Sequence, residues 1–373
     1  MKTRLVLLLI VLPAISVTSV SACTTFVLKN QDQIIYGRSF DFDIGNGFIV
    51  NNKRGIQKRA FVQDINNAMK WTSKYGSITF NQAGMEFPYG GMNESGLVIA
   101  QMYYGQSQYP SKDHRKEISV LQWIQYQLDI AGSVDEVIAS DTILRISNEM
   151  PVGIHVLVCD SNGKIASIAF IDGEMVCWKD EELPIPLMNN NSYEESISYL
   201  KQFDIMGGNE EITWNNANDI TSWSHDNTLA GKQLFAAAAQ KMSNVSDESN
   251  LVESGFDVLK SVTLGSHTKW STIFDVTNSM IYFKNQKRKE IITLNMSDFD
   301  FNKDAQSIIL DIQSATSENT MSQFVPYTTE LNRKYTYDAV IPLIESGFIP
   351  FQLSEEMIEA QIMLPEQFKK IDR

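Results

Sequence analysis

The chain has 373 residues, which is enough for one large domain or two modest ones. Hydrophobic residues make up 43% and charged residues 20% of it, a composition that can bury a core and that excludes global disorder. Asp and Glu total 45 against 31 Lys and Arg, a formal net charge of −14, and no Lys/Arg cluster stands out. A nucleic-acid binder normally has a basic excess, so we expect no nucleic-acid partner.

The first 22 residues have the pattern of a cleavable signal peptide. A basic start at Lys2 and Arg4 precedes an unbroken apolar run over 5–12, and Val20-Ser21-Ala22 has the small residues of a signal-peptidase site. The apolar run is shorter than the roughly 20 residues that a membrane-spanning helix needs. We therefore expect residues 1–22 to be removed and a secreted or periplasmic chain to begin at Cys23.

Two interpretations of Cys23 remain open. Val20-Ser21-Ala22-Cys23 is a tolerable lipobox, so Cys23 could carry the acyl chains of a lipoprotein. Lipoproteins usually follow this cysteine with a flexible polar tether. Here the β-branched and aromatic segment 24–29 follows at once and predicts a strand. A cysteine at the start of a strand is better placed for chemistry than for anchoring.

The next segment predicts a β-hairpin that returns to Cys23. A polar turn over 29–32 separates the first strand from a second one over 33–43. The far strand brings Arg38 and Asp41 towards the start of the chain. An arginine beside the thiol would favour the thiolate, and a carboxylate would orient a terminal ammonium. The alternative is an ordinary ion pair at a strand end.

An N-terminal cysteine can act as its own catalytic pair. Its thiol has a pKa of about 8.5 and a free α-amine about 7.7–8.0, so the amine is a near-neutral base within the same residue. Such an enzyme needs no catalytic histidine. The four histidines are scattered and lack metal-ligand spacing, and no glycine-rich phosphate loop follows a strand. We therefore expect neither a metal nor a cofactor.

The rest of the chain predicts alternating blocks of strands and helices. Strands are expected over 48–52, 77–81 and 97–104, followed by helices over 118–131 and 133–139. A three-stranded meander over 154–159, 164–170 and 175–178 follows, and it places Cys159 and Cys177 on its outer strands, too far apart for a disulfide. Further helices are expected over 193–203, 230–242 and 249–262. Periodicity alone gives an α+β class.

Several motifs, taken in order, resemble the choloylglycine hydrolases, a family of N-terminal-nucleophile (Ntn) hydrolases that includes bile salt hydrolases and penicillin V acylases. The opening Cys23-Thr24-Thr25-Phe26 and then Gly37-Arg38-Ser39-Phe40-Asp41-Phe42 are similar to the start of that family. Later matches are Gly91-Met92-Asn93-Glu94-Ser95-Gly96-Leu97, Met102-Tyr103-Tyr104, the meander, the segment 189–196 and the strand pair 268–285. The resemblance covers roughly residues 23–300.

The resemblance implies a fold and a set of catalytic roles. The fold is a four-layer αββα sandwich of two antiparallel sheets, with 23–373 as one domain and 301–373 as a less certain C-terminal appendage. Cys23 would be the nucleophile, with its own amine as base, and Arg38 and Asp41 would tune it. Tyr103 and Asn190 would stabilise the oxyanion. Asn190 is chosen within Asn189-Asn190-Asn191 because Tyr193 then aligns without a gap.

The resemblance also implies pocket residues and shows one departure. Side chains from the corresponding loops surround the substrate in the family, which points to Phe42, Met85, Phe87 and Tyr104. The family's late catalytic arginine has no counterpart here, and only Lys232 could replace it. Lysine lacks the bidentate fork of arginine, so the two are not equivalent.

Three functions follow from these observations. The first is an exported amidase that cleaves a linear carbon–nitrogen amide bond in N-acylated small molecules: penicillin V-like amides, N-acyl homoserine lactones or conjugated bile salts. Penicillin V acylases carry Tyr where bile salt hydrolases carry Asn, so Tyr103 favours the first two substrates. The alternatives are an Ntn dipeptidase and a non-enzymatic, lipid-anchored surface protein. Homo-oligomerisation remains open.

Overall fold

The computed structural model describes residues 23–150, 152–220, 227–346 and 353–371, so the expected signal peptide lies outside the described residues. The hairpin predicted after Cys23 forms the centre of a six-stranded sheet that is antiparallel throughout. The strands of this sheet are, in spatial order, β14 (Leu187–Met188), β1 (Thr24–Lys29), β2 (Ile34–Asp41), β15 (Thr268–Asp275), β16 (Met280–Asn285) and β17 (Ile292–Asn295).

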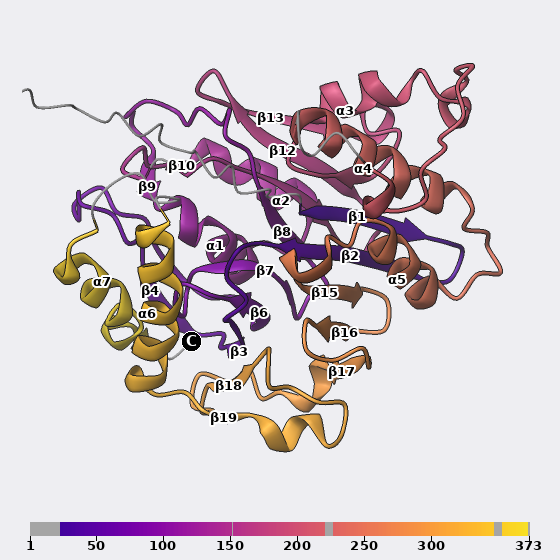
Figure 1. The fold of residues 1–373 in the computed structure, drawn as a ribbon. Coiled ribbons are helices and arrows are strands. Elements are labelled where there is room, and N and C mark those ends of the chain that lie inside the picture. The colour runs from indigo at the N-terminus through magenta and orange to yellow at the C-terminus, as the bar shows by residue number, and fades with distance from the viewer. Residues whose placement is uncertain (1–22, 151, 221–226, 347–352, 372–373) are drawn as a thin grey trace, which may run out of the picture.

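A second, nine-stranded antiparallel sheet lies against the first (Figure 1). Tyr36 of β2 donates a hydrogen bond of 3.0 Å from its hydroxyl to the Leu157 carbonyl, which ties the two sheets together. The strands of the second sheet are, in spatial order, β13 (Glu174–Lys179), β12 (Ile165–Ile171), β11 (Ile154–Cys159), β8 (Val98–Tyr103), β7 (Pro88–Asn93), β6 (Ser77–Asn81), β3 (Phe48–Asn52), β18 (Ile308–Asp311) and β19 (Val325–Pro326).

Helices cover the outer faces of both sheets (Figure 1). On the six-stranded sheet α5 (Leu251–Ser261) packs on β1, β2 and β15, with α4 (Asn227–Ser243) and α3 (Tyr193–Leu200) beside it. On the nine-stranded sheet α1 (Trp123–Ile130) packs on β7 and β8, next to α2 (Val134–Ala139). The layer order is therefore helix, sheet, sheet, helix, which confirms the expected αββα sandwich.

Alternation along the strands explains why two cores form. In β8, Val98, Ala100 and Met102 face the six-stranded sheet, whereas Ile99 faces α1. In β11, Leu157 and Cys159 likewise face the six-stranded sheet, whereas Val156 and Val158 face the helices on the other side. Since successive side chains of a strand point to opposite faces, a strand buried on both sides must be apolar at almost every position.

The remaining elements belong to two small sheets and a C-terminal segment. β9 (Lys116–Ile118) pairs in parallel with β10 (Leu144–Ile146). β4 (Ile56–Arg59) lies between β5 (Lys70–Thr72) and β20 (Lys369–Lys370). The C-terminal segment adds β18 to the edge of the large sheet and continues into α6 (Thr329–Glu345) and α7 (Glu355–Ile362).

The structure differs from the sequence-based expectation at two helix ends. The helix predicted over 118–131 begins as β9 and a 3-10 turn, Val120–Gln122, before α1 starts at Trp123. The helix predicted over 193–203 ends at Leu200 because Phe203 turns away to pack edge-on against Trp214. The meander order is confirmed: β12 separates Cys159 from Cys177, although Cys177 is only half-buried.

Candidate active site

Strand register places Cys23 and Arg38 on the same face of the six-stranded sheet. Thr25 lies opposite Arg38 in the β1–β2 pair, and continuing that register sets Cys23 opposite Phe40. Directly opposed residues in an antiparallel pair point to the same side. Thr25 donates from its hydroxyl to the Met102 sulfur of β8 at 3.1 Å, so this side faces the nine-stranded sheet. Cys23 is 5% exposed at the rim of that interface.

Arg38 is a buried cation held by one carbonyl and one aromatic ring. The Nη1 atom donates to the Tyr89 carbonyl, and the guanidinium lies 5.4 Å from the centre of the Phe40 ring. Phe40 is itself stacked on Trp270 at 3.9 Å. Burial raises the pKa of the Cys23 thiol above its ordinary value, and the neighbouring Arg38 charge opposes that rise.

Asp41 is fully buried, and two hydroxyl groups donate to its carboxylate. Ser39 donates to Oδ2 and Thr268 donates to Oδ1. A β-bulge in β15 between Thr268 and Trp270 shifts the register so that Thr268 lies opposite Asp41. Burial raises the pKa of Asp41 to about 6, against the lowering effect of the two hydroxyls and Arg38. The Asp41 backbone carbonyl also accepts from the Cys23 thiol at 3.6 Å.

Asn190 follows β14, the strand that pairs with β1. Thr25 pairs with Met188, the last residue of β14, and Asn190 lies two residues beyond it in a bend. Its two neighbours are held elsewhere: Asn189 donates from its amide to the Gly231 carbonyl and Asn191 to the Thr228 carbonyl, at 2.5 and 2.7 Å. Of the three asparagines, Asn190 remains the predicted oxyanion donor.

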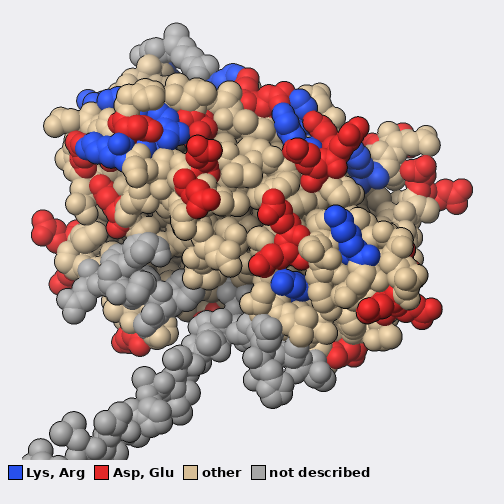
Figure 2. Space-filling view, turned by 90° about the horizontal axis from the view of Figure 1, so that it is seen from above, with Lys and Arg blue, Asp and Glu red and all other residues tan. Residues whose placement is uncertain are grey.

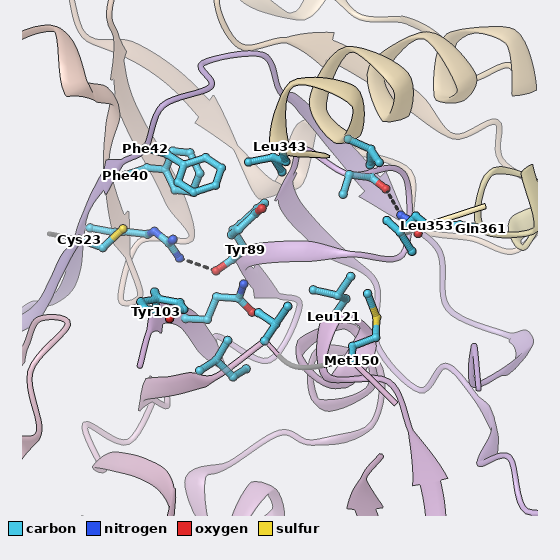
Figure 3. A pocket seen from close by; sticks show the side chains of 16 residues that line it. Cys23, Phe40, Phe42, Tyr89, Tyr103, Leu121, Met150, Leu343, Leu353 and Gln361 are labelled. Carbon is cyan, nitrogen blue, oxygen red and sulfur yellow. Dashed lines mark hydrogen bonds between the residues drawn. The ribbon is translucent and has the colours of Figure 1, made fainter. Parts of the chain in front are cut away.

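A largely apolar cavity opens beside Cys23. Figure 3 shows Cys23 at one end, Tyr89 in the middle, and Leu353 and Gln361 at the other end. Tyr103, the last residue of β8, is 44% exposed and lines the same cavity. The other lining residues are Arg38, Phe40, Phe42, Ala83, Gln101, Leu121, Met150, Val152, Ile154, Val340 and Leu343.

Of the five predicted substrate-binding residues, Phe42 lines this cavity and the other four lie outside its lining. Met85 packs in the cluster of Phe48 and Tyr335, because the loop that carries it turns towards α6. Phe87 packs edge-on against Phe61. Tyr104 stacks on the buried His155 at 4.7 Å, on the opposite side of β8 from Tyr103. Lys232 lies on α4, 3.8 Å from Glu195.

Sequence reasoning missed three kinds of residue at this site. The hydroxyls of Ser39 and Thr268 and the carbonyl of Tyr89 hold the two charged groups, but register and bulges set these contacts. Gln101 could have been inferred, since it precedes Tyr103 by two residues on the same strand face. Val340 and Leu343 come from a segment that no recognised motif covered.

The described residues contain no candidate metal site. Among them, no cluster of His, Cys, Asp or Glu is arranged to hold a metal ion. On the face seen in Figure 2, acidic and basic side chains are interspersed. No helix within the described ranges is long and apolar enough to cross a bilayer.

Comparison with known proteins defines the class. Residues 23–311 match the model of the linear amide C–N hydrolases, choloylglycine hydrolase family. The chain therefore belongs to this family and is an amidase that acts on linear, non-peptide amides. Every motif on which the resemblance was based lies within the matched range, and so does Lys232, the only residue that could replace the family's late arginine.

Individual relatives include enzymes of both named types. Penicillin V acylase from Pectobacterium atrosepticum is 25% identical over 319 residues, 75% of this chain and 82% of the relative. The structure of penicillin V acylase from Agrobacterium tumefaciens matches with a TM-score of 0.67 at 22% identity, covering 82% of this chain and 98% of that one. A mutant of conjugated bile acid hydrolase from Clostridium perfringens matches with a TM-score of 0.60 at 17% identity, covering 78% and 96%. Both structural matches share the sandwich fold.

Proposed function

We propose that this protein is an exported amidase whose nucleophile is Cys23, made N-terminal by removal of residues 1–22. One observation carries the proposal: the Cys23 sulfur lies at the end of an apolar cavity, with a buried arginine and a buried aspartate on the adjacent strand. Buried charges without an oppositely charged partner cost free energy, and a catalytic role would account for keeping them here. Burial alone makes the thiol unreactive, so an activating base is required.

The free α-amine of Cys23 would supply that base. It takes the thiol proton, and the thiolate attacks the substrate carbonyl carbon to form a tetrahedral oxyanion. Collapse of the oxyanion breaks the C–N bond, and the protonated amine returns its proton to the leaving nitrogen. A water molecule then attacks the thioester while the α-amine takes one of its protons, and the ammonium returns that proton to the sulfur as the C–S bond breaks, which releases the carboxylic acid and restores the thiol. No external oxidant or cofactor enters this balance.

The charged neighbours have separate roles in this scheme. The Asp41 carboxylate accepts a hydrogen bond from the α-ammonium and orients it, as its position one strand away from Cys23 allows. Arg38 favours the thiolate over the thiol by its charge. Because Arg38 donates to the Tyr89 carbonyl, it is also held against movement towards bulk solvent.

Two polar groups would stabilise the oxyanion. Asn190 lies two residues beyond the end of β14, the strand that pairs with β1, and Tyr103 lines the cavity that opens beside Cys23. A donor aimed at the developing negative charge in a site shielded from water is commonly the largest single contribution to acyl transfer.

The substrates we propose are penicillin V-like amides or N-acyl homoserine lactones, in preference to conjugated bile salts. The cavity is flanked by the rings of Phe40, Phe42, Tyr89 and Tyr103, which suits a planar aryloxyacetyl group or a straight acyl chain better than a rigid steroid. The named activity of the 25% identical relative agrees with this preference.

The test compares turnover of a substrate panel by the mature protein and by Cys23→Ser. Phenoxyacetyl amides and acyl homoserine lactones are expected to be hydrolysed faster than glycine- and taurine-conjugated bile salts, and Cys23→Ser should lose nearly all turnover with its fold intact. Cys177→Ser is the matched control, since Cys177 lies on β13, outside the cavity lining. A Cys23→Ser protein with wild-type rates would refute the nucleophile. Faster cleavage of bile salts would overturn only the substrate preference. Cleavage of dipeptides, without cleavage of acyl amides, would favour the dipeptidase.

A further inference from the structure

The far end of the active-site cavity is formed by the C-terminal segment. Val340 and Leu343 of α6, together with Leu353 and Gln361, line the cavity that begins at Cys23 (Figure 3). The family model ends at residue 311, so all four lie beyond the part of the chain that matches the family. This end of the cavity therefore lies outside the part of the chain that matches the family model.

We propose that α6 and α7 form the distal wall of the acyl-binding site and limit its length, so that the preferred substrates are amides of straight-chain aliphatic acids. The inference rests on the proposed function, because it assumes that the acyl carbonyl is bound at Cys23. The acyl chain then runs past Tyr89 towards α6, and its terminal methyl group ends against Gln361.

The helical pair is anchored firmly enough to act as a wall. Arg333 of α6 forms a bidentate ion pair with Glu359 of α7, with N–O distances of 3.0 and 2.8 Å. Asn332 joins α6 to two other parts of the chain: its side-chain oxygen accepts from the Met85 amide at 2.8 Å, and its amide donates to the Ile362 carbonyl at 2.9 Å. These contacts connect both helices to the loop that precedes β7.

Further contacts fix the same helices to the sheet and to the cavity rim. Tyr335 donates from its hydroxyl to the Asp311 carboxylate of β18 at 2.9 Å. Gln361 donates to the carbonyl of Ala83, which is itself a lining residue. The side-chain amide of Gln361 thus closes the end of the cavity, and its nitrogen is already hydrogen-bonded to Ala83.

The chemistry of the lining favours an aliphatic chain of limited length. Val340 and Leu343 are three residues apart on α6 and so share one helix face, and both are about 95% or more buried. Leu343 lies across the cavity from Leu121 and Met150 in Figure 3, and Val152 also lines the cavity. Each methylene buried there should improve kcat/KM about fourfold. A chain that reaches Gln361 would press apolar atoms against a polar amide, so the gain should stop at that length.

Opposite substitutions at Leu343 test the wall. With N-acyl homoserine lactones that differ by successive pairs of methylenes, kcat/KM of the mature wild-type protein should rise with chain length and then fall. Leu343→Phe should move the optimum to shorter chains by about two carbons, and Leu343→Ala should move it to longer chains by a similar amount. Ile341→Phe is the control, because Ile341 is 37% exposed on the same helix and lies outside the lining.

A binding measurement separates this inference from the proposed function. Straight-chain fatty acids are titrated into Cys23→Ser and into the same protein carrying each Leu343 substitution, and their dissociation constants are compared by chain length. If the two Leu343 substitutions shift the preferred chain length for binding in opposite directions, the wall is supported. If the wild type also hydrolyses no acyl amide, the amidase mechanism is refuted while the wall stands. An unchanged preferred length in both Leu343 variants, in turnover or in binding, would overturn the wall.

Discussion

At the scale of single residues, the site holds two opposite charges away from water. Arg38 is 3% exposed and Asp41 is fully buried. Neither forms a direct ion pair that the structure records; each is held by neutral polar partners, a carbonyl for Arg38 and two hydroxyls for Asp41. Neutral partners satisfy hydrogen bonds but do not cancel charge. Each group therefore still exerts its field on Cys23 between them.

The raised pKa of Asp41 predicts an acidic limit to activity. Protonation of the α-amine lowers kcat/KM as the pH falls through about 8. The Asp41 carboxylate loses its charge as the pH falls further, through its pKa of about 6, so a second and steeper decrease should set the acidic limit. An α-ammonium at Cys23 would lower this pKa and move the limit to more acidic values. Because the Thr268 hydroxyl stabilises the ionised form, Thr268→Val should raise the pKa of Asp41 and move the limit upward by about one pH unit.

The control for this prediction is Thr263→Val, since the Thr263 hydroxyl donates to the Leu259 carbonyl at the end of α5. Its pH profile should match that of the wild type. The measurement is kcat/KM from about pH 4 to about pH 9 in each variant. A Thr268→Val profile that coincides with the wild type, or that shifts to lower pH, would contradict the role given to Asp41.

Tyr103 gives a second prediction at this scale. If its hydroxyl donates to the oxyanion, Tyr103→Phe should reduce kcat by about 10²–10³ with little change in substrate affinity, because the hydrogen bond strengthens only in the transition state. The control is Tyr104→Phe, whose ring stacks on His155 outside the cavity lining. Equal losses in the two variants, or a loss confined to KM, would argue against an oxyanion contact.

At the scale of elements, the strands β1, β2 and β15 set the site by register. Gly37 is required in β2 because a Cβ atom there would lie 2.2 Å from the Phe26 ring of β1. With Phe26 directly over Gly37, the neighbouring pair Thr25 and Arg38 points to the other side of the sheet, where Cys23 also lies. The bulge in β15 then brings Thr268 opposite Asp41.

This dependence on register explains which parts of the site the sequence could predict. Cys23, Arg38 and Asp41 lie on consecutive strands of one hairpin, so alternation and a short turn were enough to bring them together. Thr268 is 227 residues from Asp41 and reaches it only through a bulge, which no local pattern indicates. Met85 and Phe87 were wrongly predicted to line the cavity for a similar reason. Glu86 between them has a φ of 78°, and this left-handed backbone conformation turns the loop away from the cavity.

The same loop supports a prediction about stability. Lys58 of β4 lies 2.8 Å from Glu86 and 3.0 Å from Asp129, and all three side chains are almost completely buried. Lys58→Met would leave two buried carboxylates without a cation and should lower the free energy of unfolding by about 3–5 kcal/mol. Lys112→Met, which removes an exposed pair with Asp64, should cost about 1 kcal/mol or less. Urea unfolding of both variants measures the difference, and equal losses would show that burial does not govern these pairs.

At the scale of the whole molecule, the site lies where the two sheets and the C-terminal helices meet. Cys23 comes from the six-stranded sheet, Tyr89 and Tyr103 from the nine-stranded sheet, and Leu343 from α6 (Figures 1 and 3). The prediction that the chain after residue 300 is an appendage therefore understates its position, since it contributes both a strand to the large sheet and a wall to the cavity.

The last prediction concerns processing of the whole chain. Cys23 is 5% exposed and lines the cavity, so an α-amine released at this residue would lie at the cavity, within reach of its own thiol. An amide nitrogen in the same place has no usable lone pair and cannot take the thiol proton. Intact-mass measurement of the exported protein should therefore give the mass of residues 23–373. A variant with one alanine inserted before Cys23 should fold with the same unfolding midpoint yet lose nearly all turnover. A mass increased by acyl chains would support the lipoprotein, and full activity of the inserted variant would exclude the α-amine as the base.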